Sequence, residues 1–303
     1  MKKMRLHIWI LLGVYVVLLI LGSFLDLQVS QGLNASKNNG FGLFFAAFGG
    51  MPGIMLVPFV GGGCIALALK KQYHKVLNVF FIIFAVACLV VGTYYAGREI
   101  FGPNGFTNDK LYYLGFVIVL PFMLGGEYLG YYVAKRSKNP HLFFVLAVFT
   151  AVMFIALVPF VALLKVIFHR PRFRIVSDDS LQGIVFHNWW ERSKDYKDLM
   201  ALNHLASEEF KSFPSGHAGY ATLLIIAAVF IPPLDESLKK IQVPLFYVAF
   251  VYSLFVSFTR ILVAAHFLSD VSMGSLIGVA TAYVGNEIVI AHTKKVESKV
   301  VVE

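Results

Sequence analysis

The sequence contains little charge for its length. Of its 303 residues, 14% are charged and 58% are hydrophobic, whereas a soluble domain is about one quarter charged. This shortage excludes an ordinary soluble domain and makes a polytopic membrane protein the expected class. The net charge of +9 does not indicate a nucleic-acid partner, because the cations lie mostly in short loops between apolar runs, as membrane orientation requires.

Cysteine is equally scarce. The two cysteines, Cys64 and Cys88, fall inside apolar segments, where cysteine behaves as a small buried hydrophobe. This excludes a disulfide framework and indicates no metal-binding pair. The sequence also lacks internal repeats and low-complexity tracts, and we expect a single domain over residues 1–303.

Long apolar runs are what the sequence does contain. Eight of them are long enough, or nearly so, to cross a bilayer at about 20 residues each. The expected fold is therefore all-α, a polytopic membrane bundle of about eight transmembrane helices. The runs cover approximately residues 7–25, 43–69, 76–96, 111–134, 141–164, 217–233, 242–263 and 268–291.

The first two runs have unusual features. The first follows Lys2, Lys3 and Arg5 as a signal peptide would, but no small-residue cleavage site follows it, so we expect a retained anchor. The second contains Pro52 and the glycines at 61–63. That composition favours close helix packing or a broken helix.

Lysine and arginine positions predict the orientation. If the N-terminus is cytoplasmic, the inside segments carry fourteen Lys and Arg residues. The two shorter outside loops then hold only Lys37, Arg98 and Lys110. This distribution follows the positive-inside rule. It places both termini in the cytoplasm and three polar segments, at 165–172, 214–217 and 259–270, on one outer face.

The last of these segments carries a histidine and a carboxylate. His266 and Asp270 are four residues apart at the start of the last apolar run, so they share a helix face. A carboxylate on one imidazole nitrogen would fix the tautomer and leave the other nitrogen free to attack. Arg260, at the end of the preceding run, would place a planar cation near the same point.

The middle segment is Pro214-Ser215-Gly216-His217, which opens the sixth apolar run. Serine is a good N-cap, and glycine lets the backbone approach an anion closely. Free backbone N–H groups at a helix N-terminus bind anions. His217 would stand beside the bound group as a proton donor to a leaving oxygen.

The first segment supplies further cations. Lys165 ends the fifth run, and Arg172 would fall on the same side if the helix continued, whereas Arg170 would point elsewhere. Pro171 makes a continuous helix unfavourable, so this argument leaves both arginines open as ligands. Phosphoryl transfer depends largely on positioned positive charge, which this segment and Arg260 provide.

These residues resemble the type 2 phosphatidic acid phosphatase family, which also includes vanadium haloperoxidases and glucose-6-phosphatase. The family pattern is K-x6-R-P, then P-S-G-H, then S-R-x5-H-x3-D, and the resemblance covers about 165–291. Two positions depart from it, since Thr259 replaces the usual Ser and Phe173 stands where Pro is expected. The K-x6-R spacing favours Arg172 over Arg170 as the phosphate ligand.

The resemblance implies a role for each matched residue. His266 is the nucleophile that forms a phosphohistidine, Asp270 orients it, and His217 protonates the leaving group and then activates water. No metal and no other cofactor is implied. The phosphoryl oxygens are held by Lys165, Arg172, Arg260 and the backbone of Ser215 and Gly216.

We therefore predict an integral membrane lipid phosphatase with a six-helix core over 76–291 and extra N-terminal helices over 1–75. Its substrate would be a lipid phosphate monoester or diphosphate, such as phosphatidic acid, phosphatidylglycerophosphate or undecaprenyl diphosphate. The expected setting is a bacterial plasma membrane. The expected partners are the substrate and membrane lipids, without nucleic acid or an obligatory protein partner.

Two alternatives use the same sequence features. A phosphotransferase would pass the phosphoryl group to an alcohol through the same residues. A lipid or solute transporter with a relict site would need neither the His266–Asp270 pair nor His217. The eight apolar runs disfavour a haloperoxidase. Glu127 and Glu287 lie within apolar runs and are expected to be structural. Trp189 and Trp190 suit the membrane interface, and their segment is expected to be either an interfacial lid or a plain loop.

Overall fold

The chain is almost wholly helical. The computed structural model describes residues 2–70, 73–103, 105–137, 139 and 141–300, and no strand occurs among them. Lys71 and Lys138, two of the cations that predict the orientation, lie outside the described residues. The helices in chain order are α1 (Lys2–Gly32), α2 (Gly40–Phe48), α3 (Met51–Ile54), α4 (Leu56–Leu69), α5 (Lys75–Phe101), η1 (Asp109–Leu111), α6 (Tyr112–Arg136), α7 (His141–Phe168), α8 (Phe173–Val176), α9 (Tyr196–Leu202), η2 (Ser207–Phe210), α10 (Gly216–Leu234), η3 (Glu236–Ile241), α11 (Gln242–Leu262) and α12 (Leu268–Val300).

Eight stretches within the described residues are long and apolar enough to cross a membrane. Their outward faces carry large apolar side chains, for example Val117 at 64% and Val248 at 65% exposed, which suit lipid and not water. The predicted all-α membrane bundle is thereby confirmed. The stretches are Met4–Gly32, Gly40–Leu69, Lys75–Phe101, Asp109–Arg136, His141–Val176, Gly216–Leu234, Ser237–Leu262 and Leu268–Thr293.

The second span is a broken helix. Gly49 and Gly50 separate α2 from α3, and Met55 separates α3 from α4. The break lets α3 lie directly on α10: a Cβ atom added to Gly53 would be 1.8 Å from the Tyr220 carbonyl oxygen. Only glycine permits this approach, so the N-terminal helices are fixed against the helix that begins with Gly216.

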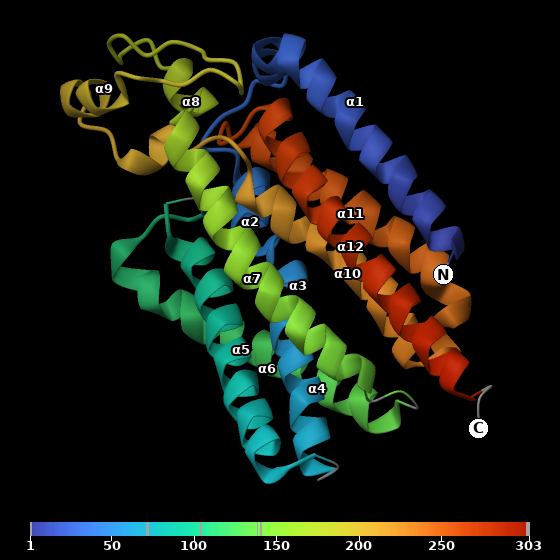
Figure 1. Ribbon diagram of the computed structural model, residues 1–303. Helices are drawn as coiled ribbons and strands as arrows, with labels where there is room; N and C mark the ends of the chain where they lie inside the picture. Colours follow the sequence, from blue (N-terminus) through green and yellow to red (C-terminus); the bar gives the residue numbers. More distant parts are fainter. Residues whose placement is uncertain (1, 71–72, 104, 138, 140, 301–303) are drawn as a thin grey trace.

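The spans form two groups with α7 between them (Figure 1). In one group α10 packs on α11, α12 and α3, and α1 lies along the outer side of α12. In the other group α4 packs on α5 and α6. Helix α7 contacts both α4 and α12. Helix α7 therefore joins the two groups, and the N-terminal helices are packed against the rest of the bundle.

The segment that joins α7 to α10 lies at one end of the bundle, and both termini lie at the other (Figure 1). It contains α8, α9 and η2. Trp189 ties it to α1, because the indole Nε1 donates a hydrogen bond of 2.9 Å to Ser23 Oγ. The same indole stacks on Phe213, with ring centroids 5.4 Å apart. This segment covers the polar end where the site residues meet.

Candidate active site

His266 lies in the short turn between α11 and α12 and is 2% exposed. Its Nδ1 is 2.7 Å from the carbonyl oxygen of Ser212. Because a carbonyl oxygen only accepts, Nδ1 carries the proton and Nε2 keeps its lone pair. Burial also lowers the pKa of the imidazole well below its usual range. The structure thus fixes the tautomer of His266 and leaves the lone pair on Nε2.

Asp270 is placed differently from what its spacing suggested. Its Oδ2 is 3.8 Å from His266 Nδ1, too far for a hydrogen bond. The carboxylate instead accepts hydrogen bonds from the Ser212 hydroxyl and from the backbone N–H of Phe267. Asp270 therefore acts on His266 through Ser212, which presents its carbonyl oxygen to the imidazole. No sequence pattern marked Ser212.

Arg170 belongs to the structural support of the site. Its guanidinium is fully buried and lies 2.5 Å from Asp270 Oδ1 and 2.8 Å from Asp26 Oδ2. It also donates to the hydroxyl of Ser269 at 2.8 Å and to the carbonyl oxygen of His187 at 2.9 Å. These four acceptors engage all three of its nitrogens, so Arg170 is committed to holding α1 and α12 together. Asp26 of α1 was not anticipated from the sequence.

Arg172 and Arg260 have side-chain N–H donors without acceptors among the described residues. Both guanidinium groups are buried, at 1% and 0% exposure. Among the residues that the structure describes, Arg172 Nη1 and all three side-chain nitrogens of Arg260 have no hydrogen-bond partner. Buried guanidinium groups normally have acceptors, so the unpartnered nitrogens of these two could donate to an anion. The geometry therefore favours Arg172, and not Arg170, as the phosphate ligand.

Positive charge converges on His266. The cations that act electrostatically on its imidazole are Arg172, Arg260 and Lys165. Lys165 Nζ is 3.0 Å from the Lys211 carbonyl oxygen. Arg172 Nε donates to the Glu208 carbonyl oxygen at 2.8 Å, a further neighbour that the sequence did not indicate. This concentration of cations beside a neutral imidazole suits a bound phosphate.

The N-terminus of α10 meets the same cluster. The Ser215 hydroxyl caps the helix by accepting from the Ala218 N–H at 3.4 Å. The Ser215 N–H is already engaged, because it donates to the Asp270 carbonyl oxygen at 3.0 Å. The sequence predicted that the backbone N–H groups of Ser215 and Gly216 both bind phosphate. Because the Ser215 N–H is engaged, only the Gly216 N–H is left for that role. The Ser215–Asp270 bond instead fixes α10 against α12.

His217 follows one residue later and is 5% exposed. Its Nε2 is 2.9 Å from the carbonyl oxygen of Ala46 and 3.3 Å from Oε2 of Glu99. Glu99 escaped the sequence argument because the third apolar run was expected to end at residue 96. In the structure α5 continues to Phe101, which places this glutamate inside a span.

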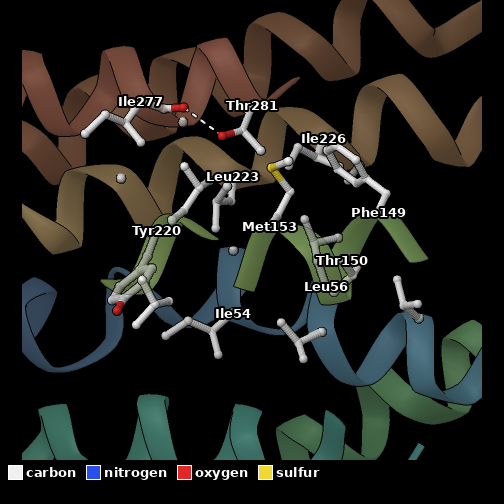
Figure 2. A pocket seen from close by; sticks show the side chains of 18 of the residues that line it. Ile54, Leu56, Phe149, Thr150, Met153, Tyr220, Leu223, Ile226, Ile277 and Thr281 are labelled. Carbon is white, nitrogen blue, oxygen red and sulfur yellow. Dashed lines mark hydrogen bonds between the residues drawn. The ribbon is translucent and has the colours of Figure 1, made fainter. Parts of the chain in front are cut away.

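A cavity of about 160 Å³ adjoins the cap of α10. Ser215 and Gly216 line it at one end, and Phe230 and Ile231 line it further along the same helix. Figure 2 shows side chains from α3, α4, α7, α10 and α12 around it, among them Ile54, Met153 and Leu223. The lining is almost entirely apolar. The cavity is therefore an apolar space that borders the site at Ser215 and Gly216.

The glutamates singled out earlier lie away from this cluster. Glu287 pairs with Arg5, whose Nε is 2.6 Å from its Oε1, and so joins α12 to α1 near the termini. Glu127 lies in α6 and is partly exposed. The contact of Glu287 agrees with the structural pairing expected for it.

Comparison with known proteins identifies the family. No curated protein and no solved structure shows significant similarity to the chain. The sequence model of the PAP2 superfamily matches residues 140–294, just over half of the 303 residues. This confirms the resemblance found in the sequence and includes all three polar segments. The chain therefore belongs to the PAP2 superfamily, as an integral membrane member with eight candidate spans.

Proposed function

We propose that the protein is a membrane lipid phosphatase that hydrolyses a lipid phosphate monoester or diphosphate through a phosphohistidine. The observation that carries this proposal is the pair of buried guanidinium groups with unpartnered nitrogens, Arg172 and Arg260, which act on the neutral His266. Such a group of fixed positive charges stabilises the transition state of phosphoryl transfer. The enzyme would need no metal, since the cations are side chains.

The proposed reaction has two steps. In the first, the lone pair of His266 Nε2 forms a bond to phosphorus and the bond from phosphorus to the lipid oxygen breaks. That oxygen takes a proton from His217. In the second step, water attacks phosphorus and gives a proton back to His217. The N–P bond breaks, inorganic phosphate leaves, and His266 is restored.

The apolar cavity supports a lipid as the substrate. It begins at Ser215 and Gly216, beside the proposed phosphate site, and continues along α10 to Phe230, a distance of about 20 Å at 1.5 Å per residue. An alkyl or isoprenoid chain in this space would place its terminal phosphate near His266. A soluble sugar phosphate would gain no binding free energy from this apolar lining.

We further propose the orientation and setting of the enzyme. The positive-inside distribution supports cytoplasmic termini and an active site on the outer face of a bacterial plasma membrane. The segment with α8 and α9 lies at the end of the bundle opposite the termini (Figure 1), which is compatible with this orientation. The proposed partners are lipids alone.

The test is phosphate release by detergent-purified protein in the presence of EDTA. Wild type and His266→Ala are compared on phosphatidic acid and on undecaprenyl diphosphate. We expect metal-independent release, and a loss of at least about 1,000-fold in the variant, because the nucleophile is removed. Release that survives in His266→Ala would overturn the mechanism, and absence of release from wild type on either lipid would overturn the proposed activity.

A further inference from the structure

We propose that Glu99 of α5 is a positioning residue for catalysis, which holds His217 in the tautomer and charge state that protonates the leaving oxygen. This inference rests on the proposed function, since it assigns the partner of its general acid. It also gives α2 and α5 a part in the active site. Those helices lie before residue 140, outside the range matched by the family.

The geometry defines which nitrogen of His217 transfers the proton. The Glu99 carboxylate and the Ala46 carbonyl oxygen both approach Nε2, at 3.3 Å and 2.9 Å. Both groups are acceptors, so Nε2 carries a proton and is held in place. Proton exchange with the substrate is left to Nδ1. A carboxylate behind a histidine is a recurrent device for fixing the reactive tautomer.

The charge of Glu99 addresses a specific difficulty of this site. Burial of His217 is the largest effect that disfavours a positive charge on its imidazole, and the neighbouring cations Arg260 and Lys165 add to it. A general acid must nevertheless hold its proton until the leaving oxygen takes it. The carboxylate offsets the neighbouring cations and stabilises the imidazolium form. Its charge acts on Arg260, Arg172 and Lys165 as well.

The carboxylate is itself supported. Glu99 is 6% exposed, and its Oε1 accepts a hydrogen bond of 3.1 Å from Arg98 Nε. The Arg98 guanidinium lies over the rings of Tyr94 and Tyr95, at 5.8 Å and 5.2 Å from their centroids. A charged glutamate inside a membrane span has a high desolvation cost unless it is paired, and such residues often mark a functional site. One oxygen faces this arginine while the other faces His217.

The packing keeps this arrangement at a fixed distance. Ala46 lies in α2, and Gly53 of the following helix α3 touches the backbone of α10 at Tyr220, one turn beyond His217. Glu99 lies in α5, which packs against α2. Helices α2, α3 and α5 therefore approach α10 as one packed unit. Their contact brings both acceptors to a single nitrogen.

The experiment compares Glu99→Gln with Glu99→Asp, and uses Glu127→Gln as the matched control. Glu127 is also a glutamate in a span before residue 140, and it lies outside the site. The glutamine amide oxygen can still accept from His217 Nε2–H, so a merely structural role would survive this change. The measurements are kcat and KM across pH for a lipid monophosphate and a lipid diphosphate.

For Glu99→Gln we expect kcat on the monophosphate to fall about 100-fold, the scale of general acid catalysis, with KM within about threefold. The basic limb of the pH profile should move to lower pH by about one unit or more, because the imidazolium loses its counter-charge. The diphosphate should lose less, since its leaving phosphate needs less protonation than an alkoxide. Glu99→Asp should show smaller changes, and Glu127→Gln none.

Wild-type pH dependence and leaving-group preference in an active Glu99→Gln enzyme would overturn this inference and leave the proposed function intact. Failure of the wild type to release phosphate from either lipid would overturn both. If Glu99→Gln does not fold, Glu99→Ala, which also removes the charge, decides the question. A shift of its basic limb to lower pH supports the inference, and an unshifted limb refutes it.

Discussion

Two arginines that are neighbours in sequence have separate functions in this site. Arg170 faces the carboxylates of Asp26 and Asp270, whereas Arg172 keeps a buried nitrogen without a partner among the described residues. Pro171 lies between them, after the end of α7 at Phe168. The backbone is extended at Arg172, and the two guanidinium groups have different partners. One supports the fold, and the other keeps the donor that we propose for substrate.

This difference predicts opposite phenotypes. Arg172→Ala should lower phosphate release about 100- to 1,000-fold, as loss of one transition-state donor does, with little change in melting temperature. Arg170→Ala should destabilise the protein by about 3–5 kcal/mol, because it leaves two buried carboxylates unpaired. Arg174→Ala, which removes a partly buried pair with Glu209, serves as the control. A stable, inactive Arg170→Ala beside an active Arg172→Ala would assign the ligand to Arg170.

The buried imidazole of His266 predicts a pH-dependent stability. Because burial lowers its pKa in the folded state, the unfolded chain binds the proton first when the pH falls below about 6.5. The contribution of His266 to the free energy of unfolding is therefore fully present above that pH. It decreases below it by about 1.4 kcal/mol for each pH unit, until the pKa of His266 in the folded protein is reached.

The measurement is thermal unfolding in detergent between pH 7.5 and 5, for wild type and His266→Gln. Glutamine can still donate a hydrogen bond to the Ser212 carbonyl oxygen, but it does not titrate. The wild type should lose more melting temperature than the variant over this interval. Parallel losses would show that the imidazole titrates normally in the folded protein.

At the scale of the helix, apolar length predicted the elements better than it predicted their ends. All eight runs appear as spans, and the Gly and Pro residues of the second run predicted its break. The third run was expected to end before Arg98 and Glu99, since charges usually mark a loop. Helix α5 includes both because the carboxylate is paired inside the bundle. Pairing of this kind depends on tertiary structure, which a local pattern does not contain.

The cavity predicts a difference between two adjacent positions of α7. Met153 lines the cavity (Figure 2), whereas Val152 is 51% exposed on the outer face of the helix. Met153→Trp should fill the space that we assign to the lipid chain. It should lower kcat/KM for a long-chain lipid phosphate at least about tenfold, since several buried methylenes lose their contacts.

The same variant should retain most of its activity on a short-chain lipid phosphate, and Val152→Trp should resemble wild type on both. The measurement is phosphate release as a function of chain length in matched detergent micelles. Equal losses on short and long chains, or equal effects of the two tryptophans, would show that the chain binds elsewhere.

At the scale of the whole molecule, the site is assembled from both ends of the sequence. The groups that correspond to the family pattern could be named from the resemblance, because they fall in three short segments. Their supporting groups could not: Asp26 comes from α1, Ala46 from α2 and Ser212 from the segment before α10. Each contact joins residues that are dozens of positions apart or more. Only the packing of the complete bundle brings them together.

The last prediction concerns the orientation of the protein in the membrane. Asp179 and Lys240 are both exposed, in the segment before α10 and in η3. The distribution of cations predicts that the first is outside the cell and the second inside. The native Cys64 and Cys88 are 0% and 5% exposed, so they should react little with a thiol reagent.

Asp179→Cys and Lys240→Cys would be expressed separately in bacterial cells and treated with a membrane-impermeant maleimide. We expect Asp179→Cys to be labelled in intact cells and Lys240→Cys only after lysis, with phosphate release retained in both. The reverse pattern would place the active site on the cytoplasmic face. The enzyme would then act on lipid phosphates of the inner leaflet, because the phosphate site and the Asp179 segment lie at the same end of the bundle.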